Sequence, residues 1–177
     1  MESIILTRDM EFTIRPWSGT DSVEEITEML HLAYGELARQ GMNYNASHQP
    51  PAQTLERLQA GDSFVAVESD SGVIVGTITL SHVKSTNHHQ YYRRTGLVYF
   101  GQFGVRPDYQ GFGIAKRLYQ TVEDHARAVG ATEIALDTAE TAHGLIAMYR
   151  RWGFEIVDTA DWESTNYISV IMSKPLI

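Results

Sequence analysis

One short segment whose residue types and spacing could bind a ligand is VRPDYQGFGIAKRLYQ at residues 105–120, where two glycines precede a helical pattern. Gly111 and Gly113 stand where a helix is about to begin, and the first amides of a helix have no partner within it. Free N–H groups and the helix dipole both favour a bound anion at such a position. The spacing alone leaves two interpretations open, a simple turn with a capped helix and a phosphate-binding loop.

The known phosphate-binding patterns narrow this choice. The pattern G-x-x-x-x-G-K-[ST] is absent from the chain, and G-x-G-x-x-G fails at its third glycine, where Lys116 stands. What remains is Q-x-x-G-x-A, which is spelled by Gln110, Gly113 and Ala115.

This pattern resembles the acyl-CoA-binding motif of the GNAT superfamily of N-acetyltransferases, R/Q-x-x-G-x-G/A. The downstream segment LIAMYRRWGFEIV resembles the second motif of that family, with Tyr149 and the pair Gly153–Phe154 in the usual places. The close match covers roughly residues 97–158. The resemblance implies an α/β fold with a mixed, largely antiparallel central sheet, flanked by helices and splayed between its fourth and fifth strands. It also implies a single N-acetyltransferase domain over residues 1–177, with a core of about 12–175, and acetyl-CoA as cosubstrate.

The resemblance also names residues for the cofactor. The pyrophosphate would lie on the amides of residues 111–115, Phe103 and Val105 would offer backbone groups to the pantetheine arm, and Arg117 is one basic side chain that could face the phosphates. The family often has an asparagine where this chain has Ala142, with His143 beside it, which puts one usual contact in doubt. The implied cofactor-binding set is Phe103, Gly104, Val105, Gln110, Gly111, Phe112, Gly113, Ile114, Ala115, Lys116, His143 and Arg151. For any single basic side chain, a solvated surface position is the alternative.

The chain has no cysteine, so an acyl-cysteine intermediate is excluded and direct attack of an amine on the thioester is the simplest route. In the family the general acid is a tyrosine at the spacing of Tyr149. A phenol is protonated at neutral pH, with a pKa of about 10, not far above that of a thiol. The alternative is that Tyr149 only packs on the helix face that it shares with Leu145, Met148 and Trp152.

The general base is less defined. Many relatives place a carboxylate on the strand that corresponds to LVYFGQF, where this chain has Gln102 and no acid. Asp137 and Glu140 are weak candidates. The other options are His82, His88 or His89, a water, and an acceptor that is already partly deprotonated. These histidines are not accompanied by the carboxylate or cysteine ligands of a metal site, so no metal is expected.

Loops with aromatic and hydrogen-bonding side chains make Tyr44, His48 and Trp162 weak candidates for acceptor contacts. The acceptor is expected to be a small amine or a peptide amine: a polyamine, an amino-acid derivative, an aminoglycoside, a peptide N-terminus or a lysine. The net charge of −8 mildly favours a cationic acceptor. The competing hypothesis is a CoA-binding regulatory or sensing module that has lost catalysis.

The elements that must position these residues follow from periodicity and turn signals. Gly101 and Gly104 inside a strand predict a bulge or a close backbone approach. The predicted strands are 12–17, 63–69, 72–80, 97–105, 133–138, 154–158 and 166–173, and the predicted helices are 23–37, 52–59, 114–129 and 145–152.

The bulk composition of the 177 residues is that of an ordinary globular protein, with 43% hydrophobic and 20% charged residues. The chain has no basic stripe of the kind that binds nucleic acid, and it has no apolar run long enough to span a membrane. The N-terminus lacks the features of a signal peptide, so a cytoplasmic protein is expected, as a monomer or a homodimer.

Overall fold

The computed structural model describes residues 9–177, and in it seven strands form one sheet in the order β1-β2-β3-β4-β5-β7-β6. The strands are β1 (Phe12–Pro16), β2 (Asp62–Glu68), β3 (Ile74–His82), β4 (Leu97–Val105), β5 (Glu133–Ala139), β6 (Glu155–Ala160) and β7 (Ser169–Pro175). The α-helices are α1 (Val23–Ala33), α2 (Gly35–Arg39), α3 (Pro51–Ala60), α4 (Ile114–Ala128) and α5 (His143–Arg151). Short 3-10 turns occupy Asn45–Ser47, Gln90–Arg93 and Pro107–Tyr109.

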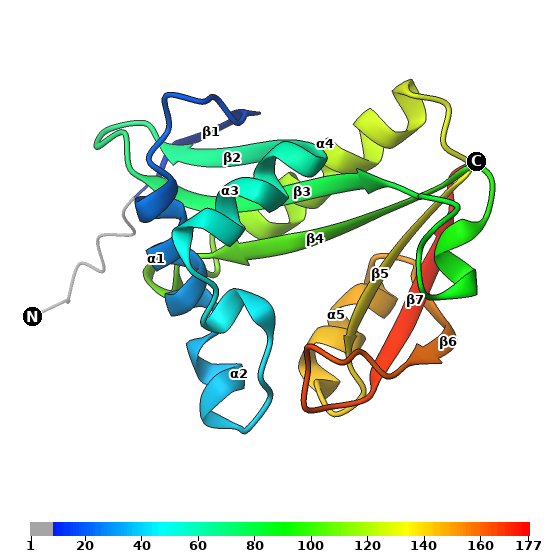
Figure 1. Ribbon diagram of the computed structural model, residues 1–177. Helices are drawn as coiled ribbons and strands as arrows, with labels where there is room; N and C mark the ends of the chain where they lie inside the picture. Colours follow the sequence, from blue (N-terminus) through cyan, green and yellow to red (C-terminus); the bar gives the residue numbers. More distant parts are fainter. Residues whose placement is uncertain (1–8) are drawn as a thin grey trace, which may run out of the picture.

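The sheet opens between β4 and β5. These two strands pair in parallel from Leu97 with Glu133 to Tyr99 with Ala135, whereas every other neighbouring pair is antiparallel. Beyond that point β4 stays with β3 and β5 stays with β7, so the two strands diverge (Figure 1). The predicted fold, a mixed and largely antiparallel sheet splayed between its fourth and fifth strands, is confirmed.

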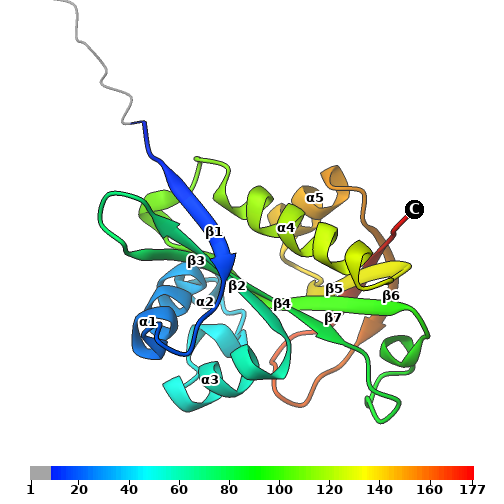
Figure 2. The same ribbon diagram turned by 90° about the horizontal axis from the view of Figure 1, so that it is seen from above.

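Helices cover both faces of the sheet. Seen from above, α1, α2 and α3 lie on one side, and α4 and α5 lie on the other (Figure 2). The apolar positions of α4 recur every four residues, and Ile114, Leu118 and Val122 are fully buried in the core. This burial fixes the beginning of α4, where the glycine loop enters it.

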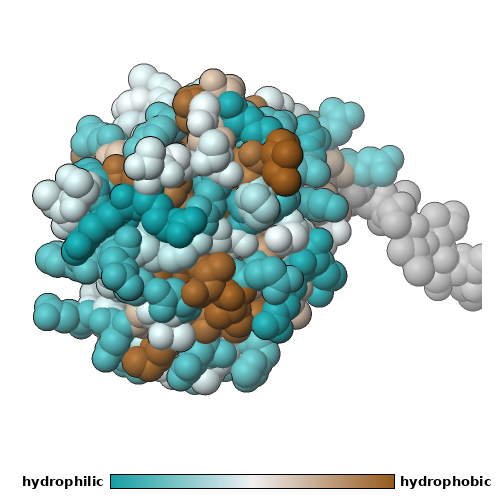
Figure 3. Space-filling model, turned by 90° about the vertical axis from the view of Figure 1, so that its right-hand side faces the viewer, coloured by the Kyte–Doolittle hydropathy of each residue, from teal (hydrophilic) through white to brown (hydrophobic). Residues whose placement is uncertain are grey.

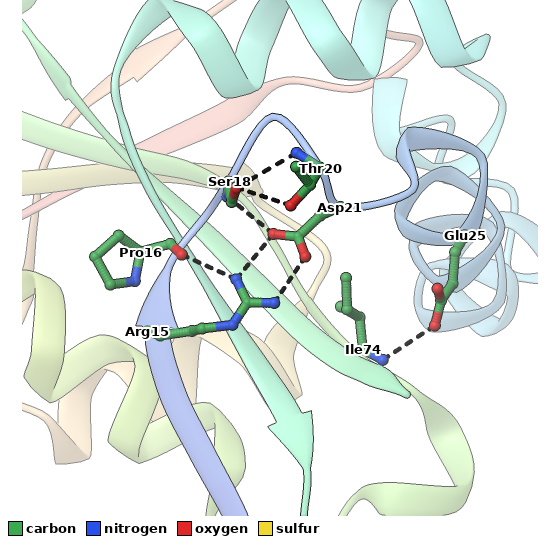
Figure 4. Close-up of polar contacts among 7 residues, drawn as sticks. All are labelled: Arg15, Pro16, Ser18, Thr20, Asp21, Glu25 and Ile74. Carbon is green, nitrogen blue, oxygen red and sulfur yellow. Dashed lines mark hydrogen bonds and ion pairs between the residues drawn. The ribbon is translucent and has the colours of Figure 1, made fainter. Parts of the chain in front are cut away.

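The corner between β1 and α1 is held by a polar cluster (Figure 4). The guanidinium of Arg15 donates to both carboxylate oxygens of Asp21, at 2.9 and 2.7 Å. Ser22 caps α1 by accepting from the amide of Glu25, and Glu25 accepts in turn from the amide of Ile74 in β3 at 3.0 Å. The start of α1 is therefore tied to the sheet, which also sets the position of its C-terminal end.

The two largest differences between the predicted boundaries and the structure concern the first helix and the last strand. The helix expected over 23–37 is divided, because α1 ends at Ala33 and Gly35 begins the separate helix α2. Glycine has low helix propensity, and the side chain of Tyr34 at the break donates to the carbonyl of Phe103 at 2.6 Å. The last strand begins at Ser169 rather than at residue 166.

The two glycines of β4 mark both features that the sequence predicts for them. The register of β3 and β4 shifts between Gly101 and Gly104, and Gln102 has a positive φ of 45°. A Cβ on Gly104 would lie 3.1 Å from the Cβ of Ala33, so this glycine lets α1 approach the sheet. A Cβ on Gly101 would lie 3.6 Å from Nη2 of Arg57.

The surface on the side of β6 and β7 is mostly hydrophilic, with separate apolar patches (Figure 3). Ile156 and Val157 of the edge strand β6 are 40% and 44% exposed. Within residues 9–177, no helix has the length and apolar character that crossing a bilayer requires. No group of three or more His, Cys, Asp or Glu side chains in this part of the chain is arranged to hold a metal ion.

Candidate active site

The loop between β4 and α4 turns on two left-handed glycines. Gly111 has a φ of 87° and Gly113 a φ of 80°, a region that side chains other than glycine rarely adopt. Gly113 is the N-cap of α4 and offers no side-chain cap, so the first amides of this helix are left without a partner inside it. A Cβ built on either glycine meets nothing within 4 Å, which shows that the space beside the loop is open.

A cavity of about 470 Å³ lies against this loop, and we call it the loop cavity. Leu145, Met148 and Trp152 give it an apolar wall, and Lys116 supplies a cation; no carboxylate is among its described lining residues. Amides, a cation and an apolar wall together suit an elongated ligand with an anionic group at one end. The lining residues are Ala33, Tyr34, Leu37, Phe103, Gly104, Val105, Tyr109, Gln110, Gly111, Gly113, Ile114, Ala115, Lys116, Leu145, Met148, Tyr149 and Trp152.

Most of the residues expected at a cofactor thus lie together, and three do not. Phe112 is 45% exposed, and His143 and Arg151 are exposed on α5; none of the three lines the loop cavity. Phe103 lines the cavity, but its carbonyl oxygen already accepts from the hydroxyl of Tyr34. One of its two lone pairs is therefore in use.

A second cavity, of about 240 Å³, has a polar lining, and we call it the polar cavity. Tyr34, Leu145 and Tyr149 line both cavities, so the two meet at these side chains. The other lining residues are Tyr44, Asn45, Ala46, Arg57, Phe100, Gly101, Gln102, Asp137, Thr138, Trp162, Ser164, Thr165 and Tyr167.

Tyr149 stands at this junction with its hydroxyl available. The residue is 7% exposed, and within residues 9–177 its hydroxyl has no hydrogen-bond partner. Burial raises the pKa of Tyr149 well above its ordinary value, and the nearby Tyr34, Tyr44 and Asp137 raise it further. The phenol is therefore neutral across the physiological pH range and can donate a hydrogen bond into the junction.

Asp137 is the carboxylate of the polar cavity. It lies on β5 two residues beyond the last residue paired with β4, and its side chain is accessible from the cavity. The hydroxyl of Tyr92 and Nε1 of Trp162 each donate to it at 3.0 Å. Desolvation raises the pKa of Asp137, and these two donors with the charges of Arg57 and His89 partly offset that rise. A carboxylate with a raised pKa is suited to accepting a proton.

Tyrosine rings form the wall of the polar cavity. Tyr44 contacts Tyr34 with ring centroids 5.2 Å apart and Tyr167 with centroids 4.9 Å apart. The hydroxyl of Tyr44 bonds to Oγ1 of Thr138 at 2.7 Å and accepts from the amide of Ala139 at 3.1 Å. Tyr44 thus fixes the loop after α2 against β5.

Arg57 is the main residue of this cavity that the sequence did not single out. Its Nη1 donates to Oε1 of the fully buried Gln49 at 2.8 Å, and Nε2 of Gln49 donates to Oε1 of Gln102 at 2.9 Å. The sequence gives only a weak indication that Arg57 points inward, namely its place on a helix next to two buried residues. It follows Thr54 by three residues and precedes Leu58, and both of these are buried.

Several other expected residues lie elsewhere. Glu140 and His48 are exposed and line neither cavity, and the same holds for His88 within the described lining. His82 bonds to Asp62 at 3.2 Å, away from both cavities. His89 bonds to a backbone carbonyl and lies 5.9 Å from Trp162, measured between ring centroids. Of the acceptor candidates, Tyr44 and Trp162 line the polar cavity.

Comparison with known proteins adds an independent finding. A model described as the acetyltransferase (GNAT) family matches residues 23–154. An IAA acetyltransferase from Azospirillum brasilense is 35% identical over 72 residues, which is 41% of this chain and 47% of that protein, so the match spans about half of the relative.

Solved structures with this fold include PH1933 from Pyrococcus horikoshii OT3, with a TM-score of 0.73 and 22% identity, over 93% of this chain and 98% of that one. They also include yncA from Salmonella typhimurium, described as a putative acetyltransferase with its cofactor acetyl-CoA. It has a TM-score of 0.70 and 18% identity, over 94% of this chain and 95% of that one. At these identities the likeness concerns the fold.

Proposed function

The chain belongs to the acetyltransferase (GNAT) family, and from this premise we propose that it is an N-acetyltransferase that moves an acetyl group from acetyl-CoA to a primary amine by direct attack. The observation that carries the proposal is the meeting of the two cavities at Tyr149. A donor in the loop cavity and an acceptor in the polar cavity would come together at this side chain. We further propose that residues 1–177 act as one domain.

The loop cavity fits an acyl-CoA. Its open glycine cradle and the first amides of α4, which lack a partner within the helix, suit a diphosphate, Lys116 suits the remaining phosphate charge, and the wall of Leu145 and Met148 suits the pantetheine chain. Acetyl-CoA supplies the acetyl group, activated as a thioester. In the proposal the protein binds and orients this donor through residues 103–116 and leaves the acid–base work to the side chains at the junction.

The proton balance assigns a role to each of two groups. The carboxylate of Asp137 accepts a proton from the acceptor ammonium, so that the nitrogen lone pair can form the N–C bond as the C–S bond breaks. The hydroxyl of Tyr149 donates to the departing sulfur, which leaves as a thiol. The ammonium loses two protons in all: one passes through Asp137 to solvent, and the other replaces the proton that Tyr149 gave to sulfur. Because burial raises the pKa of Tyr149, its hydroxyl holds its proton until negative charge develops on sulfur.

The proposal is tested by calorimetric titration with acetyl-CoA and by thiol release with a panel of amines. Tyr149→Phe should bind acetyl-CoA normally and lose about 100-fold in thiol-release rate, since general acid catalysis contributes about 10²–10⁴-fold. Tyr91→Phe is the matched control, because the hydroxyl of Tyr91 bonds to Glu133 outside both cavities. Unchanged turnover of Tyr149→Phe would remove the acid assignment.

Two other outcomes separate the alternatives. Acetyl-CoA binding without thiol release for any amine would favour a CoA-binding regulatory or sensing module. Absence of acetyl-CoA binding would contradict the assignment of the loop cavity. A cytoplasmic location, a monomer or homodimer, and the absence of nucleic-acid and membrane partners stay predictions.

A further inference from the structure

The polar cavity contains both a cation and an anion that do not touch. Arg57 enters it from α3 and Asp137 from β5. Among the residues that the structure describes, no salt bridge joins them, and neither has another ion-pair partner. Opposite charges that line the same small space without pairing leave both available to a ligand.

Arg57 has more donors than the protein uses. A guanidinium carries five N–H donors, and in the described part of the chain only Nη1 has an acceptor, the side-chain oxygen of Gln49. Burial lowers the pKa of Arg57, which reflects a charge taken out of water without a contacting carboxylate. Gly101 keeps the space beside Nη2 free, since a Cβ there would lie 3.6 Å from that nitrogen.

Asp137 has hydrogen-bond donors to both of its oxygens, but its carboxylate can still accept further hydrogen bonds. Each of its oxygens accepts one hydrogen bond, from Tyr92 and from Trp162, and a carboxylate oxygen can accept more than one. Its side chain is accessible from the cavity. An ammonium group of a ligand could therefore approach it without displacing either donor.

We infer that the acceptor is a small zwitterion, an amino acid with a free carboxylate, whose carboxylate binds Arg57 and whose amine lies between Asp137 and Tyr149. The inference rests on the proposed function and adds the substrate class to it. A planar guanidinium binds a carboxylate through two parallel hydrogen bonds, which gives orientation as well as affinity. The cavity volume of about 240 Å³ suits a single amino acid better than a long polyamine. The competing explanation is that Arg57 only offsets the charge of Asp137 across the cavity.

The experiment compares matched acceptors in a thiol-release assay with saturating acetyl-CoA. The probes are the twenty L-amino acids, the same amino acids as carboxamides, and spermidine as an amine without a carboxylate. We expect the best amino acid to exceed its own carboxamide by about 100-fold in kcat/KM, the size of a buried, hydrogen-bonded charge pair. This comparison uses the unmodified protein, so it does not depend on how any variant folds.

Variants of Arg57 locate the effect. Arg57→Gln should lower kcat/KM for the amino acid by about 100-fold, chiefly through KM, and should lower kcat/KM for the carboxamide far less at a pH where Asp137 is ionised in both proteins. Arg57→Lys should recover part of the loss, because it restores the charge without the two-pronged geometry. Acetyl-CoA affinity should be unchanged in both variants, since Arg57 does not line the loop cavity.

Each remaining outcome contradicts the inference in a distinguishable way. Equal turnover of amino acids and carboxamides, or turnover of spermidine alone, overturns the zwitterion assignment and leaves acetyl transfer intact. Acetyl-CoA binding with no thiol release for any probe or for a lysine-containing peptide removes both the proposed function and the inference.

Discussion

The loop cavity takes most of its binding groups from one continuous run of chain, residues 103–116, whereas the polar cavity takes Tyr44, Arg57 and Asp137 from segments far apart in the sequence. The first relies on backbone amides and on glycines that no side chain can replace without strain. The second relies on side-chain charges whose strength depends on burial.

This difference suits the loop cavity to a ligand group that many proteins share, and the polar cavity to a ligand that differs from one protein to another. Backbone amides offer the same donors whatever the side chains are, so a shared group such as a diphosphate can be held by loop geometry alone. Side-chain charges can change by single substitutions, so they suit the choice of acceptor. Substitutions at Asp137 and at Gly113 each alter one cavity, so the other cavity serves as the internal reference.

The largest expected effect is that of Asp137→Asn. Losing a general base lowers the rate by about 10²–10⁴-fold, and we expect about a 1,000-fold fall in kcat with unchanged acetyl-CoA affinity. Steady-state kinetics and calorimetry measure the two quantities. Glu140→Gln is the control, because Glu140 is exposed outside both cavities and should be silent. A kcat within about threefold of wild type in Asp137→Asn would place the base elsewhere.

The substitution Gly113→Glu alters the other cavity and should raise the Kd for acetyl-CoA by about 100-fold. The reason is that the glutamate would lie beside the phosphates of acetyl-CoA, and like charges brought together oppose binding by several kcal/mol. Calorimetry measures this change. Gly72→Glu is a matched control: Gly72 has a φ of 72° and, like Gly113, open space around its Cβ position, but lines neither cavity. Equal losses in the two variants would mean that backbone strain, and not the site, is responsible.

The pH dependence of kcat should have an acidic limb and no alkaline limb from the tyrosine. Burial raises the pKa of Asp137, and its ionised form is the active one, so activity falls as the pH drops through a value above the ordinary aspartate range. Burial raises the pKa of Tyr149, and its neutral form is active, so this group causes no loss up to about pH 10. Profiles at saturating substrates test both limbs. Persistence of the acidic limb in Asp137→Asn would contradict its assignment.

The smallest expected effect concerns Tyr34, which lines both cavities. Tyr34→Phe removes the hydroxyl that bonds to the Phe103 carbonyl at 2.6 Å and should lower the free energy of unfolding by about 1 kcal/mol. Urea denaturation measures the change. Tyr167→Phe is the control, because the Tyr167 hydroxyl has no hydrogen-bond partner in residues 9–177. A similar loss in both variants would assign the effect to ring packing.

The element order could be predicted because hydrophobic period and turn chemistry are local, whereas the opening of the sheet was expected only from the family resemblance. The spacing around Gly113 and Tyr149, with the family resemblance that it carries, also indicated which loop faces the larger cavity. The break at Tyr34 was missed, since it depends on a bond to a residue of β4. His143 and Arg151 were expected at the cofactor from the family resemblance, and both are exposed on α5 and do not line the loop cavity.

The sequence by itself determined the left-handed glycine turn before α4, because the φ of a glycine and the free amides of a helix start are properties of consecutive residues. Only the tertiary structure decided that Arg57 and Asp137 line one cavity, and that Tyr149 stands between the two cavities with a raised pKa. The reason is physical: desolvation and the distance between charges arise only when α3, β5 and α5 pack around the opening of the sheet.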